Sequence, residues 1–141
     1  MFEECLRKQM EVKALFANCK SEDDKYKVII GLGRQQPSIS AEYKKPENII
    51  EGCQSTMYIH AYMKGDKVYF ETESDALISS GLAVLLLKVY SGELPEVILK
   101  CPPAYLEEIG IATSLTPSRS NGLYSIHLRM KQEALKLLLR G

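Results

Sequence analysis

Hydrophobic positions recur along the chain at two different spacings. Over residues 57–64, apolar residues alternate with polar or aromatic ones, and a period of two is typical of a β-strand. A Gly65-Asp66 pair follows, and the alternation resumes over residues 68–71, which together predict an antiparallel hairpin. Before and after the hairpin, apolar residues recur every three or four positions, which predicts helices on both sides of it.

Two helices are expected before the hairpin. The first has apolar positions at helical spacing on one face, namely Cys5, Val12, Leu15, Phe16 and Cys19. The second begins after the capping residue Ser21, whose three acidic successors suit the positive end of a helix dipole, and ends near residues 35–38. A polar loop then leads to about Asn48.

Four helices are expected after the hairpin. Ser74 is interpreted as the cap of a helix with Asp75 in its first turn, and this helix is apolar almost all the way round, so we expect it to be central and buried. Short helices are expected over 95–99 and 104–109, and the last helix starts after Thr116-Pro117. Its buried seam is predicted to contain Leu123, Ile126, Met130, Ala134, Leu137 and Leu138. The order helices, small antiparallel sheet, helices predicts an α+β fold of two layers in one domain, residues 1–141.

Charge and composition exclude some classes of function. Lys and Arg total 18 and Asp and Glu total 18, without a strong basic cluster, so we expect no nucleic acid as the main ligand. The longest apolar run, 82–87, is far too short to cross a membrane, and residues 2–5 do not resemble a secretory signal. We therefore expect a soluble cytoplasmic protein whose four cysteines are free thiols.

Cys53 is the candidate nucleophile. It follows Gly52, which permits a tight backbone path, and precedes Gln54 and Ser55, which offer neutral hydrogen-bond donors. A thiolate is the nucleophile of sulfur exchange, whereas the alternative role of a free cysteine is that of a small buried hydrophobe. The spacing of the four cysteines does not indicate a metal site, and His60 and His127 are expected to be half-buried polar residues.

Arg119 breaks a local rule. In the first turn of the last helix its cation opposes the helix dipole, so an anionic partner is expected: a thiolate, a persulfide, Asp75 or a carboxylate of another protein. The alternative is a solvated surface arginine. Asp75 needs no special explanation in the first turn of a helix, because an acid is stabilising there.

Two segments of the sequence resemble the signature stretches of the SufE family. They are Gly52-Cys53-Gln54-Ser55 and Leu115-Thr116-Pro117-Ser118-Arg119-Ser120-Asn121-Gly122-Leu123. Glu73-Ser74-Asp75-Ala76 resembles the family segment at the start of its central helix, and the likeness extends from about residue 10 to about residue 137. Tyr58 stands where the family commonly has tryptophan, and Thr72-Glu73 replaces a glycine–acid pair.

The resemblance implies a SufE/IscU-like fold and a sulfur acceptor that binds no cofactor. Its partners would be a SufS-type, pyridoxal-phosphate-dependent cysteine desulfurase and a downstream scaffold of iron–sulfur cluster assembly. Cys53 would carry the persulfide, with Arg119 and Asp75 as the other site residues, so the protein would be an accessory of sulfur transfer rather than a free-standing enzyme. Two alternatives stay open: a non-catalytic adaptor that regulates a desulfurase, and an iron–sulfur scaffold of related fold. The sequence also leaves open whether the protein is a monomer or a homodimer.

Overall fold

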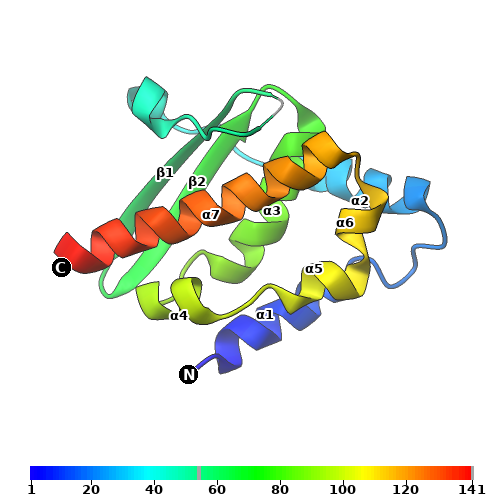
Figure 1. Ribbon diagram of the computed structural model, residues 1–141, viewed down its shortest axis with the longest axis horizontal. Coiled ribbons are helices and arrows are strands. Elements are labelled where there is room, and N and C mark those ends of the chain that lie inside the picture. Colours follow the sequence, from blue (N-terminus) through cyan, green and yellow to red (C-terminus); the bar gives the residue numbers. More distant parts are fainter. Residues whose placement is uncertain (54, 141) are drawn as a thin grey trace.

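The computed structural model describes residues 1–53 and 55–140, without the side chains of residues 112 and 113. Its helices are α1 (Glu3–Ala14), α2 (Glu22–Arg34), α3 (Leu77–Tyr90), α4 (Pro95–Lys100), α5 (Ala104–Ile109), α6 (Ile111–Ser114) and α7 (Pro117–Arg140) (Figure 1). Two short 3-10 turns, η1 (Ala41–Tyr43) and η2 (Pro46–Asn48), lie in the loop before the hairpin. The strands are β1 (Met57–Lys64) and β2 (Lys67–Ser74).

The hairpin forms where the period-two pattern predicts it. β1 and β2 pair antiparallel, from Met57 opposite Ser74 to Lys64 opposite Lys67. The apolar β1 residues Met57 and Ile59 are buried, whereas the alternating residues are more exposed. β2 extends three residues beyond the predicted stretch because the ladder with β1 continues to Ser74.

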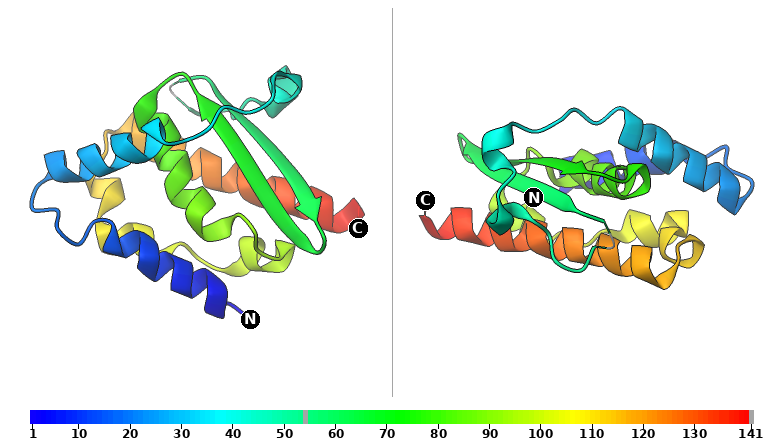
Figure 2. Two further views of the ribbon diagram at one scale, coloured as in Figure 1. Left: turned by 180° about the vertical axis from the view of Figure 1, so that it is seen from behind. Right: turned by 90° about the horizontal axis from the view of Figure 1, so that it is seen from above.

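Helix α3 is the centre of the core, as its apolar sequence predicts. It contacts α1, α2, β2 and α7. Its fully or nearly fully buried residues include Leu82, Ala83, Leu85, Leu86, Val89 and Tyr90. The α+β fold class is therefore confirmed. Figure 2 shows the two layers: α3 lies beside the hairpin, and α7 crosses one face of that layer.

Two predicted helix ends are wrong. Ser74 is the last residue of β2 rather than a helix cap, and Asp75 precedes α3 instead of lying in its first turn. The Ser74 hydroxyl does accept a backbone hydrogen bond, from the N–H of Ala76, but in the connection before the helix. At the other end of the chain α1 stops at Ala14, because the next N–H groups bond to carbonyls only three residues back, so Cys19 lies beyond the helix.

Helix α7 differs from the prediction at one position. Leu123, Ile126, Met130 and Ala134 of its predicted seam are buried, and Leu137 is partly buried. Leu138 is exposed, because it borders an open hollow beside the hairpin turn and the start of α4. In the described part of the chain, no helix combines the length and apolarity needed to cross a bilayer.

Candidate functional site

Cys53 lies in the connection between η2 and β1, where the chain passes over α7. Gly52 has a φ of +89°, a left-handed conformation that favours glycine. A Cβ atom there would also lie 2.4 Å from the Ser125 hydroxyl of α7. The left-handed backbone is therefore the main reason for glycine at position 52, and the loop also comes close to the Ser125 side chain of α7.

The Cys53 side chain is half-buried against the first turns of α7. Its Sγ lies 3.9 Å from the carbonyl oxygen of Gly122, a long contact that suits a weak S–H donor. A Cβ on Gly122 would lie 4.0 Å from both the Cα and the Sγ of Cys53, so the small residue lets the loop rest on the helix. The thiol thus lies on a helix surface that has no side chain to displace it.

A small cavity of about 10 Å³ adjoins the thiol, and it has room for about one water molecule. The residues that line it with Cys53 are Ser79, Leu82, Ser118, Arg119, Gly122 and Ile126. The structure therefore brings Cys53 and Arg119, which are 66 positions apart in the sequence, to one cavity. Its apolar walls come from α3 and α7.

Serine hydroxyls hold the strand side of the Cys53 loop. The Ser55 hydroxyl donates to Ser79 Oγ at 2.7 Å and lies 3.2 Å from Ser74 Oγ. This cluster joins the loop to the end of β2 and the start of α3. The Ser55 hydroxyl, expected as a hydrogen-bond donor beside the thiol, is thus bonded to other serines in this structure, and the donor role predicted for Gln54 falls outside the described residues.

Burial raises the pKa of the Cys53 thiol above its ordinary value. Desolvation of the sulfur is the cause of this shift, since it disfavours the charged thiolate. The surroundings of the sulfur therefore favour the neutral thiol over the nucleophilic thiolate.

The raised pKa predicts the pH dependence of Cys53 alkylation. We expect the iodoacetamide rate at Cys53, followed by peptide mapping, to have its midpoint above the ordinary thiol value of about 8.5. In urea the midpoint should return to that value. Because the thiol has a higher pKa in the folded chain than in the unfolded chain, its protonated form contributes to folding stability. This contribution is fully present below the pKa of the unfolded chain and is lost as the pH rises through the pKa of the folded chain. Equal midpoints in buffer and urea would contradict the burial of the sulfur.

Arg119 lies in the first turn of α7, as predicted, and its backbone N–H bonds to the Thr116 hydroxyl at 3.4 Å. Its guanidinium carbon lies 5.9 Å from the ring centroid of Tyr26 in α2, within the range of a cation–π contact. In the described part of the chain no carboxylate forms an ion pair with it. Arg119 is thus a cation placed at the Cys53 cavity, with its charge available to an anion that arrives there.

Asp75 does not join this cavity. It is exposed in the connection between β2 and α3, where its N–H bonds to the Thr56 carbonyl at 3.3 Å. The salt bridges of the described residues include no Arg119–Asp75 pair, so the Asp75 carboxylate is not the anionic partner expected for Arg119. Its exposed position leaves it open to contact with another molecule.

The other cysteines have different surroundings. Cys5 and Cys101 are buried, and each sulfur lies within 3.8 Å of the Gln9 side-chain nitrogen. Burial, followed by the neighbouring Cys101, raises the pKa of Cys5 to about 12, which makes it unreactive. Cys19 is half-buried beyond α1. All four are free thiols, as predicted.

Neither histidine stands beside Cys53. His60 is half-buried, 3.0 Å from a Glu71 carboxylate oxygen, and its ring stacks on Tyr43. His127 is half-buried on α7, where burial and then the nearby Lys131 lower its pKa to about 4. Over residues 1–53 and 55–140, no three His, Cys, Asp or Glu side chains gather in a way that could hold a metal ion.

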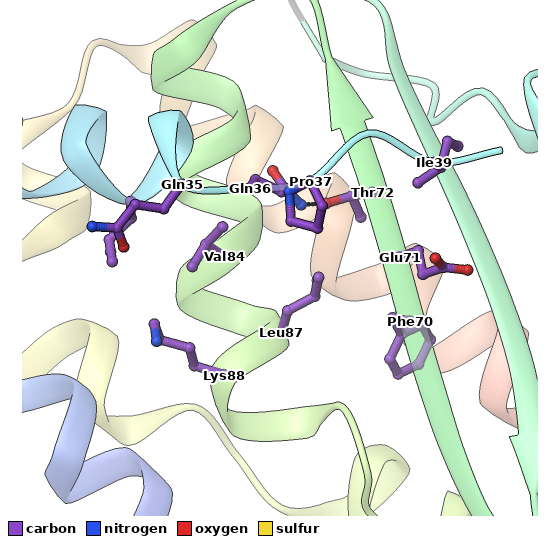
Figure 3. A pocket seen from close by; sticks show the side chains of 11 residues that line it. Gln35, Gln36, Pro37, Ile39, Phe70, Glu71, Thr72, Val84, Leu87 and Lys88 are labelled. Atoms are coloured by element: carbon purple, nitrogen blue, oxygen red, sulfur yellow. Dashed lines mark hydrogen bonds between the residues drawn. The ribbon is translucent and has the colours of Figure 1, made fainter. Parts of the chain in front are cut away.

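A hollow of about 270 Å³ lies between α3 and β2, on a different part of the surface (Figure 3). Val84 and Leu87 of α3 line it, and at its edge the Gln36 side-chain nitrogen donates to the Thr72 hydroxyl. It contains no thiol and none of the predicted site residues. The Cys53 cavity, though smaller, is therefore the candidate site.

Sequence reasoning missed the residues that shape the site. Ser74 and Ser79 anchor the loop, Gly122 receives the thiol, and Leu82 and Ile126 form apolar walls. Gly122 belongs to the stretch 115–123 that carried the family resemblance, so a signal for it existed. Ser74 and Ile126 also carried local signals, as a predicted cap and as a predicted buried residue, but their places beside Cys53 come from the approach of β2, α3 and α7.

Comparisons of the sequence with family models and with known proteins point to the same family. The family model described as "SufE: Fe-S metabolism associated domain" matches residues 10–134. A SufE-like protein 1, chloroplastic/mitochondrial, of Arabidopsis thaliana is 33% identical over 140 residues, which cover 99% of this chain and 38% of that protein. The "Cysteine desulfuration protein SufE" of Wigglesworthia glossinidia brevipalpis is 31% identical over 127 residues, covering 89% of this chain and 88% of that one.

The fold has a solved counterpart. The solution structure of a hypothetical protein from Thermus thermophilus superimposes with a TM-score of 0.74, covering 96% of each chain. The two sequences are 22% identical, so this likeness concerns the fold alone. An uncharacterized SufE-like protein of Synechocystis is 34% identical over 115 residues, covering 82% of this chain and 72% of that protein.

Proposed function

Because the chain belongs to the SufE family, whose domain is associated with iron–sulfur metabolism, we propose that it is a sulfur acceptor for a cysteine desulfurase, with Cys53 as the acceptor. The observation that carries the proposal is the placement of Cys53: a half-buried thiol in a loop on α7, in one cavity with Arg119. The proposed destination of the sulfur is iron–sulfur cluster assembly, and the proposed compartment is the cytoplasm.

The proposed reaction is a thiol–persulfide exchange. The Cys53 thiol first loses its proton, and the thiolate attacks the outer sulfur of a persulfide on the desulfurase. One S–S bond forms to Cys53 while the S–S bond in the desulfurase breaks, and the desulfurase cysteine leaves as a thiolate. The exchange involves no net oxidation or reduction, so it needs no cofactor of this chain.

The geometry supports a change of loop position during this cycle. The cavity beside Cys53 has room for about one water molecule, whereas a persulfide adds a whole sulfur atom. The raised pKa of the buried thiol likewise disfavours the thiolate in this position. We therefore propose that the loop holds Cys53 against α7 at rest and swings outward when the partner docks.

Arg119 and Asp75 have separate proposed roles. Arg119 borders the Cys53 cavity without an ion pair from the described residues, so its charge can stabilise the thiolate and the persulfide anion when they form. Asp75 lies outside the cavity and is exposed. We assign its carboxylate to the surface that contacts the desulfurase rather than to the chemical step.

Removal of the Arg119 charge should slow the transfer without harming the fold. We expect Arg119→Ala to reduce kcat/KM for sulfur transfer from the desulfurase about tenfold, equivalent to about 1.4 kcal/mol of transition-state stabilisation. Arg119→Lys should recover part of the rate. Arg34→Ala, an exposed arginine at the end of α2, serves as the control. Equal rates for Arg119→Ala and Arg34→Ala would remove Arg119 from the mechanism.

The direct test of the proposal is the location of the transferred sulfur. The protein is incubated with a cysteine desulfurase and free cysteine, and the loaded chain is digested and mapped by mass spectrometry without reductant. We expect one added sulfur on the peptide that contains Cys53. Stimulation of the desulfurase without sulfur on this chain would favour the regulatory adaptor instead, and a coloured protein after anaerobic reconstitution with iron and sulfide would favour a scaffold.

A further inference from the structure

The segment that leads to Cys53 runs along one face of α7. Three residues of α7 meet this segment, Gly122, Ser125 and Arg129, and their spacing of three and four positions places them on one face of the helix. In this order, they meet Cys53, Gly52, and the pair of Ile49 and Glu47. Residue numbers rise along α7 while they fall along the segment, so the two run antiparallel.

Arg129 binds the segment at two backbone carbonyls. Its Nη1 donates to the Ile49 carbonyl oxygen at 2.9 Å, and its Nη2 donates to the Glu47 carbonyl oxygen. Its Nε donates to the Glu133 carboxylate at 3.0 Å, and the two side chains are only 16% and 18% exposed. The carboxylate orients the planar guanidinium, and hydrogen bonds from a charged donor are roughly twice as strong as neutral ones. Arg129 is therefore a strong and directional anchor for this segment.

Backbone pairing closes the loop directly after this anchor. The Ile50 N–H donates to the Met57 carbonyl oxygen at 2.9 Å, and both side chains are buried. Ile49 also forms an antiparallel bridge with Tyr58. Residues 51–56 therefore form a loop whose two ends are held together, and Cys53 lies within it.

The loop itself is held more weakly than its base in the part of the chain that the structure describes. Towards α7, the Cys53 thiol approaches the Gly122 carbonyl oxygen at 3.9 Å, and a thiol is a weak donor. Towards the strands, neutral hydroxyl bonds hold Ser55, and one backbone bond holds Thr56. Because the charged contacts are at Arg129 and the weakest one is at Cys53, the thiol can leave α7 while the base of the loop stays in place.

We propose that Arg129 is a positioning residue of sulfur transfer, which anchors the base of the loop so that Cys53 moves out and returns about a fixed point. This inference rests on the proposed role of Cys53 as the sulfur acceptor. Cys53 is three residues beyond Ile50, and an extended chain spans at most about 3.5 Å per residue, so its Cα stays within about 10 Å of the Ile50 Cα. The desulfurase must therefore bring its persulfide within this reach of the loop base.

Alkylation of the free chain tests the anchor without a desulfurase. Arg129→Ala removes the charged donor from the base of the loop, so we expect the iodoacetamide rate at Cys53 to rise about tenfold relative to the rate at Cys19 in the same chain. A general loss of stability would raise both rates. Arg129→Lys keeps the charge without the planar fork and should recover part of the protection. Lys136→Ala is the matched control, since Lys136 lies on α7 and approaches the same Glu133 carboxylate at 3.7 Å, and it should leave the ratio unchanged.

Transfer kinetics with a desulfurase separate positioning from docking. A loop without its anchor exposes the thiol more often but places it less precisely, so we expect Arg129→Ala to lower kcat about fivefold and to change KM for this chain less than twofold. If Arg129→Ala lowers the melting temperature, Glu133→Gln repeats both measurements, and its effects should be smaller and in the same direction.

The two proposals fail in different ways. An unchanged ratio of the Cys53 and Cys19 alkylation rates, or a raised KM with unchanged kcat, would overturn the role of Arg129 while sulfur is still mapped to Cys53. Sulfur mapped to another residue would overturn the acceptor role of Cys53 and, with it, the positioning role of Arg129.

Discussion

Cys53→Ser should accept no sulfur from a cysteine desulfurase and should leave the desulfurase at the rate that it has without an acceptor. A serine hydroxyl is a far weaker nucleophile than a thiolate at neutral pH and cannot form a persulfide. Serine is close to cysteine in size, and the hydrogen bond that the thiol makes among the described residues is a long one to the Gly122 carbonyl, so we expect the fold to be unchanged. The measurements are sulfide release in the coupled assay and the mass of the loaded chain.

Cys19→Ser is the matched control. Cys19 is also a half-buried free thiol, but it lies beyond α1 and does not line the Cys53 cavity. We expect this variant to load one sulfur and to stimulate the desulfurase as the unmodified chain does. If Cys53→Ser still loads sulfur and Cys19→Ser does not, the acceptor has been misassigned. If both load normally, the assignment of Cys53 as the acceptor is rejected.

Gly81→Ala should destabilise the protein by about 3 kcal/mol, which lowers the melting temperature by about 10 °C in a chain of this size. Gly81 lies in α3 where α2 crosses it, and a Cβ there would lie 1.9 Å from the Ile29 carbonyl oxygen. The obstacle is backbone, so no side chain can rotate away and the two helices must separate. Gly33 faces the same contact from α2, where a Cβ would lie 2.2 Å from the Leu77 carbonyl oxygen.

Gly31→Ala is the matched control in the same pair of helices, and we expect it to have the opposite effect on stability. Gly31 is in α2, and a Cβ there meets no atom within 4 Å. Alanine is the better helix former, so this variant should gain about 0.5–1 kcal/mol. Thermal unfolding followed by circular dichroism distinguishes the two. A Gly81→Ala protein as stable as Gly31→Ala would show that α2 and α3 do not pack as closely as the structure places them.

The Gly81 contact also bears on the site. α3 contributes Ser79 and Leu82 to the surroundings of Cys53, one on each side of Gly81 in the sequence. If α3 shifts away from α2, the Ser55–Ser79 hydrogen bond and the apolar wall of the cavity shift with it. We therefore expect the folded fraction of Gly81→Ala to alkylate faster at Cys53 than the unmodified chain.

The sequence alone was sufficient to predict the helices and strands whose hydrophobic pattern directly reflects which residues are buried. The period-two run at 57–64 predicted β1, and the nearly uniform apolarity around residues 77–87 predicted that α3 is central. Local signals were weaker at element ends: Ser74 looks like a cap, yet it pairs with Met57 in the hairpin. A hydroxyl before an apolar run suits either position, and only the neighbouring strand decides between them.

The sequence by itself determined the candidate nucleophile, its glycine neighbour and the stretch 115–123 that contains Arg119, because these signals are local in the chain. Only the tertiary structure decided that Cys53 and Arg119 border one cavity, that Asp75 lies outside it, and that the thiol is buried enough to raise its pKa. The tertiary structure likewise decided that Leu138, which the sequence predicts in the buried seam of α7, is exposed. The physical reason is that pKa values and exposure depend on atoms brought near by the folding of distant segments, whereas hydrophobic periodicity records only which side of each element is buried.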